Sequence, residues 1–201
     1  MYFATPSWDA ALFQRVNFAW HGRLLDGIMP AVSHPLLLWA VALAAVLVFA
    51  RRMGARRTVC VLLVLGASVA LADLSCHGVK ELTGRIRPYN ALPGVRYIEN
   101  HAWAQRPPAF TPAKDHGSSF PSAHAANAMA VAMACVLALG WRRVRWALLL
   151  PLVVGYSRVY LGKHYPSDVA AGWLLGIAAA VAVHALWLLL TRDTSGTGAE
   201  R

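Results

Sequence analysis

Five long apolar stretches dominate the chain, and each is bounded by basic residues or by proline and glycine. A helix needs ~20 apolar residues to cross a hydrocarbon core ~30 Å thick, and every stretch is near that length. The pattern predicts an all-α protein, a polytopic transmembrane helical bundle with five spans. The predicted spans are residues 35–50, 58–79, 124–140, 146–162 and 169–190. The first, third and fourth are short, so their helices are expected to extend into neighbouring polar positions.

Two other segments do not follow this pattern. Residues 6–33 interleave tryptophan and phenylalanine with arginine and histidine, which is typical of a helix lying in the membrane interface. Residues 1–33 are therefore predicted to form an interfacial N-terminal segment, with a sixth, broken span as the alternative. Residues 89–120 are rich in proline, glycine and charge and are predicted to form an irregular outer loop. Loops of this length often serve as lids or binding loops.

Residues 34–191 then form one transmembrane domain, and residues 192–201 are predicted to be a disordered tail. The composition agrees, because 58% hydrophobic residues, 14% charged residues and a mean hydropathy of +0.47 exclude an ordinary soluble domain. A formal net charge of +10 would suit nucleic acid. However, the basic residues occur in short clusters between apolar runs, so no nucleic-acid partner is expected.

The arginines indicate an orientation in the membrane. They cluster in the tight connections at residues 51–57 and 142–145, and the positive-inside rule places both connections in the cytoplasm. The chain is thus predicted to be a multi-pass membrane protein with these two connections on the inside. No cleavable signal peptide is expected, because the start of the chain lacks a basic leader followed by an unbroken apolar core. The three cysteines lie in apolar runs and show neither a disulfide framework nor metal-binding spacing.

Three short strings on the predicted outer face place cations beside histidines. They are KELTGRIRP at residues 80–88, PSAH at 121–124 and SRVYLGKHYPSD at 157–168. Hydrolysis of a phosphate ester or anhydride requires fixed positive charge around the anionic oxygens of the transferring group. Lys80, Arg87 and Arg158 supply such charge. Taken singly, each is better explained by anchoring at the lipid headgroups. Together they indicate a shared anionic partner, for which phosphate is the best candidate.

The second string begins the third span. Pro121 and Ser122 indicate a helix start, where free backbone N–H groups and the positive end of the helix dipole favour an anion. The Ser122 hydroxyl and the Ala123 amide are therefore predicted phosphate ligands. His124, in the first turn, is a predicted general acid for the leaving oxygen. A capping serine followed by an interfacial histidine is the alternative.

The third string pairs His164 with Asp168, four residues later. A carboxylate at this spacing bonds one ring nitrogen and leaves the other free, which predicts His164 as the nucleophile and Asp168 as its orienting partner. The same residue types suit a metal pair. Three nearby cations repel a divalent ion, so neither a metal nor another cofactor is expected. Asp73, within the second span, is a further functional candidate, although pairing with His77 or Lys80 explains it equally well.

At these positions the chain resembles the type 2 phosphatidic acid phosphatase family, membrane lipid phosphatases that share an active site with the vanadium-dependent haloperoxidases. The family pattern is Lys, six residues, Arg-Pro; then Pro-Ser-Gly-His; then Ser-Arg, five residues, His, three residues, Asp. The first and third strings match every specified position, and the second departs at Ala123, where the family has Gly. Alanine keeps the backbone N–H but loses glycine's freedom at positive φ. The departure concerns the fine geometry of the phosphate cradle.

The resemblance implies a metal-independent hydrolase in which His164 forms a phosphohistidine, His124 protonates the leaving group and water completes the turnover. It also implies that Asp168 positions His164. The implied phosphate ligands are Lys80, Arg87, Ser122, Ala123 and Arg158. Undecaprenyl diphosphate is the first expected substrate, with phosphatidylglycerol phosphate, phosphatidate and lipid A phosphate as alternatives. A lipid phosphotransferase and a non-catalytic transport or scaffold protein stay open as other functions.

Overall fold

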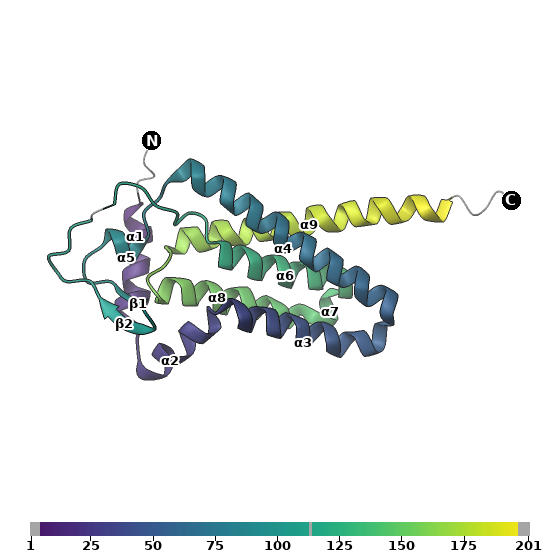
Figure 1. The fold of residues 1–201 in the computed structure, drawn as a ribbon, viewed down its shortest axis with the longest axis horizontal. Helices are drawn as coiled ribbons and strands as arrows, with labels where there is room; N and C mark the ends of the chain where they lie inside the picture. Colours follow the sequence, from purple (N-terminus) through teal and green to yellow (C-terminus); the bar gives the residue numbers. More distant parts are fainter. Residues whose placement is uncertain (1–4, 113, 197–201) are drawn as a thin grey trace.

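The computed structural model describes residues 5–112 and 114–196, and α-helix dominates them. Five of the helices run side by side along the longest dimension of the molecule (Figure 1). They are α3 (Pro35–Met53), α4 (Ala55–Thr83), α6 (Ala123–Leu139), α8 (Leu149–Tyr160) and α9 (Pro166–Gly196). Each takes in most of one predicted apolar stretch, so the all-α class and the helical bundle are confirmed.

Two helical stretches of the described chain are long and apolar enough to cross a membrane. One is Ala55–Ala91, most of which is α4, and the other is Pro166–Thr191 in α9. Helix α6 is also apolar but has 17 residues. Large apolar side chains such as Leu63 and Leu174 point outward from these helices, as expected of a surface that meets lipid. The number of spans stays a prediction.

Helix α4 ends at Thr83 because Gly84 adopts a left-handed conformation with φ +60°. Any side chain at Gly84 would be strained, and its Cβ would also collide with the ring of His116. The chain therefore turns sharply after α4. As a result, Lys80 lies on the last turn of the helix, whereas Arg85 and Arg87 follow in a non-helical stretch.

The bundle is built around α6, which packs against α4, α8 and α9. Its inward face is made of alanines, and Ala126 and Ala130 are fully buried. Facing them on α9 are Gly172 and Gly176, where an added Cβ would collide with backbone carbonyls of α6. Small residues allow two helices to approach closely. This contact holds the first turn of α9 against the start of α6, and the amide of Ser122 donates to the Asp168 carbonyl at 2.9 Å.

The N-terminal segment lies across the end of the bundle that holds the three strings (Figure 1). It comprises α1 (Ser7–Gln14), the π-helical turn η1 (Arg15–Ala19) and α2 (Arg23–Val32). Phe13 is buried with its ring centroid 5.6 Å from that of Tyr165. The Asn17 amide donates to the carbonyl of Tyr160 at 2.8 Å. These contacts anchor the segment to the bundle, while its position relative to a membrane interface stays a prediction.

The segment predicted as an irregular loop contains regular structure. After the short helix α5 (Pro88–Ala91), strands β1 (Arg96–Glu99) and β2 (Ala102–Gln105) pair in antiparallel register, with Glu99 opposite Ala102. The two turn residues, Asn100 and His101, both have positive φ, as a tight hairpin turn of the primed type requires. The prediction was wrong here because four-residue strands give little alternation and Asn-His is a weak turn signal. A lid role for the segment stays a prediction.

The opposite end of the bundle carries the arginine-rich connections. Helix α7 (Trp141–Val144) and the 3-10 turn η2 (Arg145–Leu148) lie near the turn between α3 and α4 (Figure 1). Helix α9 extends past them to Gly196, so residues 192–196, predicted as part of a disordered tail, are helical. Adding residues to an existing helix is cheap compared with nucleating one. Residues 197–201 lie outside the described residues.

Candidate active site

The predicted site residues meet at the end of the bundle where α4 and α8 finish and α6 and α9 begin. Lys80 and Arg158 occupy the last turns of α4 and α8, and Ser122 is the N-cap of α6. His164 lies in the connection before α9. The charges of Lys80, Arg158 and Arg87 all act on the His124 ring, as does His164. The structure thus brings the three strings together.

The His164 ring is buried and held by a short hydrogen bond. Its exposed fraction is 2%, and Nδ1 lies 2.8 Å from the carbonyl oxygen of Ser119. A carbonyl oxygen only accepts, so Nδ1 must carry the proton of the neutral ring. The lone pair is then on Nε2. This tautomer leaves Nε2 able to act as a nucleophile.

Asp168 lies beside His164 but serves mainly to hold its neighbours. The distance from its Oδ2 to Nδ1 of His164 is 3.6 Å, which is an electrostatic contact longer than a hydrogen bond. The same oxygen accepts from the Ser119 hydroxyl at 2.5 Å and from the Tyr165 amide at 2.8 Å. Ser119 therefore stands between the carboxylate and the ring. The i,i+4 spacing indicated the proximity of Asp168, whereas no motif indicated Ser119.

Burial and charge keep the His164 ring neutral. Burial is the main cause that lowers the pKa of His164 to about 4, and Arg158 and Arg87 lower it further. Asp168 opposes them by stabilising the charged ring. With its pKa below the ordinary value of about 6.5, His164 is unprotonated at neutral pH. A neutral imidazole is the form that attacks phosphorus.

Two buried polar atoms of the site make no hydrogen bond within the part of the chain that the structure describes. They are Oγ of Ser122, at the start of α6, and Nε of Arg158, at the end of α8. Leaving a buried donor without a partner costs about 1–3 kcal/mol. Ala123 follows in the first helical turn, where backbone N–H groups lack intrahelical acceptors. A hydroxyl, a guanidinium N–H and a helix N-terminus together form a donor set suited to a phosphate.

Arg87 and Lys80 complete the positive surroundings. Both side chains are half-buried, and Arg87 reaches the Ser118 hydroxyl at 3.4 Å. Lys163 is also near, but its ammonium donates to the Ile98 carbonyl and lies over the ring of Tyr89. Lys163 therefore ties the connection between α8 and α9 to the hairpin.

Sequence reasoning missed two linked, buried ion pairs behind the site. Arg85 is bonded to Asp168 on one side and to Asp9 of helix α1 on the other. All three side chains are almost fully buried. Arg85 falls inside the first string but at a position that the family pattern leaves unspecified. Asp9 lies 76 positions away in the chain, so no local spacing connects the two.

Asp73 makes an interhelical contact outside this group. The Asn127 amide of α6 donates to it at 3.1 Å, and its charge acts on Lys80. Its predicted partner Lys80 is thus near, while His77 faces Glu81 instead at 3.6 Å. These contacts account for an aspartate within the second predicted span, so Asp73 needs no catalytic role.

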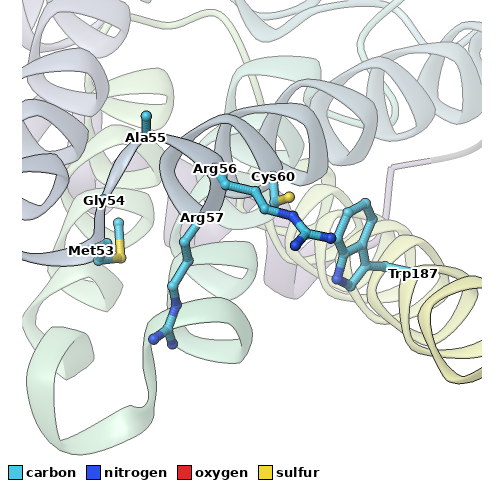
Figure 2. Close-up of a pocket in the computed structure, with 7 residues that line it drawn as sticks. All are labelled: Met53, Gly54, Ala55, Arg56, Arg57, Cys60 and Trp187. Atoms are coloured by element: carbon cyan, nitrogen blue, oxygen red, sulfur yellow. The ribbon is translucent and has the colours of Figure 1, made fainter. Parts of the chain in front are cut away.

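The cavity in Figure 2 is unrelated to these residues. It has a volume of about 480 Å³ and lies at the start of α4, next to α9, where Arg56 extends toward Trp187. At 1.5 Å per residue, the length of α4 separates it from Lys80 by roughly 35 Å. The cavity therefore belongs to the end of the bundle opposite the three strings.

Known proteins of similar sequence include phosphatases. A lipid A 4'-phosphatase of Bacteroides thetaiotaomicron is 27% identical over 163 residues, 78% of this chain and 67% of the relative. An undecaprenyl-diphosphatase of Sulfolobus acidocaldarius is 28% identical over 174 residues, 84% of this chain and 73% of the relative. Both relatives are phosphatases named for lipid substrates.

Two crystal structures share the fold. LpxE of Aquifex aeolicus superimposes with a TM-score of 0.68 over 91% of this chain and 98% of its own, at 22% identity. A transmembrane PAP2-type phosphatidylglycerolphosphate phosphatase of Bacillus subtilis has a TM-score of 0.58, over 97% of this chain and 88% of its own, also at 22% identity. Residues 59–192, which include all three strings, match the family model of the PAP2 superfamily. The chain therefore belongs to the PAP2 superfamily and is a phosphatase of lipid phosphates.

Proposed function

We propose that this protein hydrolyses a lipid phosphate or diphosphate at a membrane surface, with His164 as the nucleophile. The proposal rests on one observation: the nucleophile lies at the same end of the bundle as hydrogen-bond donors that have no partner and that suit a phosphate group. His164 presents Nε2, while the Ser122 hydroxyl and Arg158 Nε at the same end of the bundle are buried and have no hydrogen-bond partner among the described side chains and backbone. A phosphate group bound between them would satisfy both donors.

In the first step, the Nε2 lone pair of His164 attacks phosphorus. A nitrogen–phosphorus bond forms and the bond from phosphorus to the leaving oxygen breaks. His124, protonated at the start, gives its proton to that oxygen, which leaves as a lipid alcohol or a lipid monophosphate. Lys80, Arg87, Arg158, Ser122 and the Ala123 amide stabilise the charge on the remaining phosphate oxygens.

In the second step, water attacks the phosphohistidine. The neutral His124 now takes a proton from the water as the oxygen bonds to phosphorus, and the nitrogen–phosphorus bond breaks. Phosphate leaves and both histidines return to their starting states. In both steps the Ser119 carbonyl keeps the proton of His164 on Nδ1, and Asp168 stabilises the positive charge that develops on the ring. No step requires a metal ion.

The membrane arrangement is part of the same proposal. Arginine clusters at the α3–α4 turn and in α7 and η2 favour the cytoplasm for that end of the bundle. The site at the opposite end then faces the periplasm or outside of a bacterial inner membrane. Five spans, with the N-terminal segment in the outer interface, fit this orientation.

Undecaprenyl diphosphate is the substrate we propose first, with lipid A phosphate second. Both choices agree with relatives that cover most of this chain, one named as an undecaprenyl-diphosphatase and the other as a lipid A 4'-phosphatase. Phosphatidylglycerol phosphate and phosphatidate complete the panel worth testing.

The test measures phosphate release by purified protein in mixed micelles from each of these four lipids. The His164→Ala variant is expected to lose at least a thousandfold in kcat, because the residual rate would lack the nucleophile. His184→Ala, the same change some 30 Å along α9, should retain the wild-type rate. If the His164→Ala variant turned over substrate as fast as the wild type at the same concentration of folded protein, the mechanism would be overturned.

Two other functions give different results in this assay. A phosphotransferase would move label from the donor lipid to a second lipid hydroxyl, and little free phosphate would appear. A transport or scaffold protein would release no phosphate from any lipid in the panel. Retained activity in a chelator would support a site without metal, whereas a loss reversed by zinc would contradict it.

A further inference from the structure

A buried chain of charged side chains runs from helix α1 to the candidate nucleophile. Arg85 Nη2 lies 2.6 Å from Oδ2 of Asp9, and Arg85 Nη1 lies 2.5 Å from Oδ1 of Asp168. The exposed fractions are 1% for Arg85 and 0% for both carboxylates. The other oxygen of Asp168 holds Ser119, whose carbonyl accepts the hydrogen bond from His164. Four contacts in series thus connect Asp9 to His164.

Further contacts fix the arginine in this position. Its guanidinium carbon lies 4.1 Å from the ring centroid of Tyr165, and Nη1 donates to the Ser167 hydroxyl at 2.7 Å. Asp9 in turn accepts from the backbone amide of Ser167 at 2.9 Å. Helix α1 therefore contacts the first turn of α9 both directly and through Arg85. Buried ion pairs contribute little net stability, and specifying a geometry is one documented reason for retaining them.

We propose that Asp9 and Arg85 are positioning residues of the active site, which hold the Asp168 carboxylate and, through Ser119, the His164 ring in the reactive geometry. The proposal rests on the proposed function of His164. Arg85 donates a hydrogen bond to Oδ1 of Asp168, and this contact orients the carboxylate with Oδ2 toward Ser119 and His164. Asp9 keeps the cluster of two carboxylates and one guanidinium at a net charge of minus one. That charge favours the imidazolium character that His164 gains in the transition state.

This assignment brings the N-terminal segment into the active site. Asp9 precedes residue 59, where the match to the family model begins, and it connects α1 to Arg85. Helix α1 is then more than a membrane-surface element, because its Asp9 carboxylate belongs to the ion-pair cluster behind His164.

The test uses the pH dependence of kcat/KM, whose acid limb reports protonation of His164 in the free enzyme. The charged or titratable groups that face His164 are Asp168 on α9, Arg158 on α8, Arg87 before α5 and His124 on α6. None of these is changed in the variants. Each variant is compared with the wild type on one substrate, so ionisation of the substrate cancels.

Three variants change the cluster charge in different directions. Asp9→Asn removes a negative charge, so the limb should move to lower pH by about one unit. Arg85→Gln removes the positive charge, so the limb should move to higher pH by about the same amount. The double variant, Asp9→Asn with Arg85→Gln, restores the original net charge and should leave the limb near its wild-type position. In all three, kcat should fall on the order of tenfold to a hundredfold with KM within about twofold, because the phosphate ligands are untouched.

Asp26→Asn is the matched control. Asp26 also ties the N-terminal segment to its neighbours, through Arg96 of the hairpin at 3.0 Å and the Tyr160 hydroxyl of α8 at 2.6 Å, but the contacts that the structure gives it do not include Asp168. This variant should keep the wild-type kcat and acid limb even if it unfolds at a lower temperature. Circular dichroism and gel filtration identify folded protein. If either single variant does not fold, the double variant, which keeps the net charge of the cluster at minus one, carries the test on kcat.

The possible results separate this inference from the proposed function. If the wild type releases phosphate and the Asp9 and Arg85 variants behave like Asp26→Asn, the positioning role is overturned while the function of His164 stands. Limb shifts in the same direction for both single variants would also overturn it. If His164→Ala retains full activity, the proposed function itself fails, whatever the other variants do.

Discussion

Ser122 illustrates how one buried side chain can serve a ligand instead of the fold. Its hydroxyl is fully buried and has no hydrogen-bond partner in residues 5–112 and 114–196. Ser68, equally buried on α4, instead donates to the Val64 carbonyl at 2.7 Å. A structural serine satisfies its hydroxyl within the protein. The Ser122 hydroxyl is therefore free to donate to a phosphate oxygen.

Replacing Ser122 with Ala should consequently lower activity without lowering stability. Loss of a hydrogen bond to a charged oxygen removes about 1.5–3 kcal/mol of transition-state binding, a fall of roughly ten- to a hundredfold in kcat/KM. The melting temperature should stay the same or rise slightly, because no bond within the described protein is broken. Steady-state kinetics and thermal unfolding in detergent measure the two effects.

Ser75→Ala provides the comparison for this prediction. Ser75 is on α4, and its hydroxyl donates to the Leu71 carbonyl within the same helix at 2.7 Å. Its removal should leave kcat/KM unchanged. The interpretation of Ser122 would be contradicted by unchanged kinetics together with a lower melting temperature.

Motif spacing indicated those site residues that lie at helix ends, because helix ends that meet at one edge of a bundle bring their side chains together. It placed His164 near Asp168. The structure brings Arg87 and Arg158 into range of both histidines and Lys80 into range of His124. Spacing could not indicate Asp9 or Ser119. Their roles depend on tertiary contacts of residues far apart in the chain, and aspartate and serine in loops or first turns are otherwise common capping residues.

Among the helices, the contact between α6 and α9 decides the geometry of the site. Gly176 lies so close to α6 that an added Cβ would meet the Ala126 carbonyl and the Ala130 amide. The helix dipole and cap at Ser122, and the carboxylate of Asp168, both belong to this pair of helices. Separation of the two helices would therefore disturb the phosphate donors and the support of His164 together.

The Gly176→Ala variant should be less stable and less active. Overpacking a tight contact costs roughly 1–3 kcal/mol, which appears as a lower midpoint of chemical unfolding in detergent. Gly66→Ala on α4 is the control, because an added Cβ there has nothing within 4 Å. That change should be neutral or stabilising by up to about 1 kcal/mol, since alanine favours the helix. Equal stability of the two variants would show that α6 and α9 have room to adjust.

The molecule as a whole has two chemically different ends. One end holds the N-terminal segment, the hairpin and the candidate site, and the other holds the arginines of the α3–α4 turn and of α7 (Figure 1). By the positive-inside rule, arginines clustered in short connections favour the cytoplasm for the second end. The orientation also decides which lipid pool the enzyme reaches, because a headgroup does not readily cross the bilayer.

Cysteine labelling of intact cells tests this orientation. His101 at the hairpin turn and Arg143 on α7 are both exposed, so His101→Cys and Arg143→Cys place thiols at the two ends. A membrane-impermeant maleimide should label the first in intact spheroplasts and the second only after permeabilisation. The wild-type protein corrects for its own cysteines, of which Cys76 is buried and Cys60 and Cys135 are half-buried. The reverse labelling pattern would place the site in the cytoplasm and make the inner leaflet the source of substrate, whatever lipid the phosphatase assay identifies.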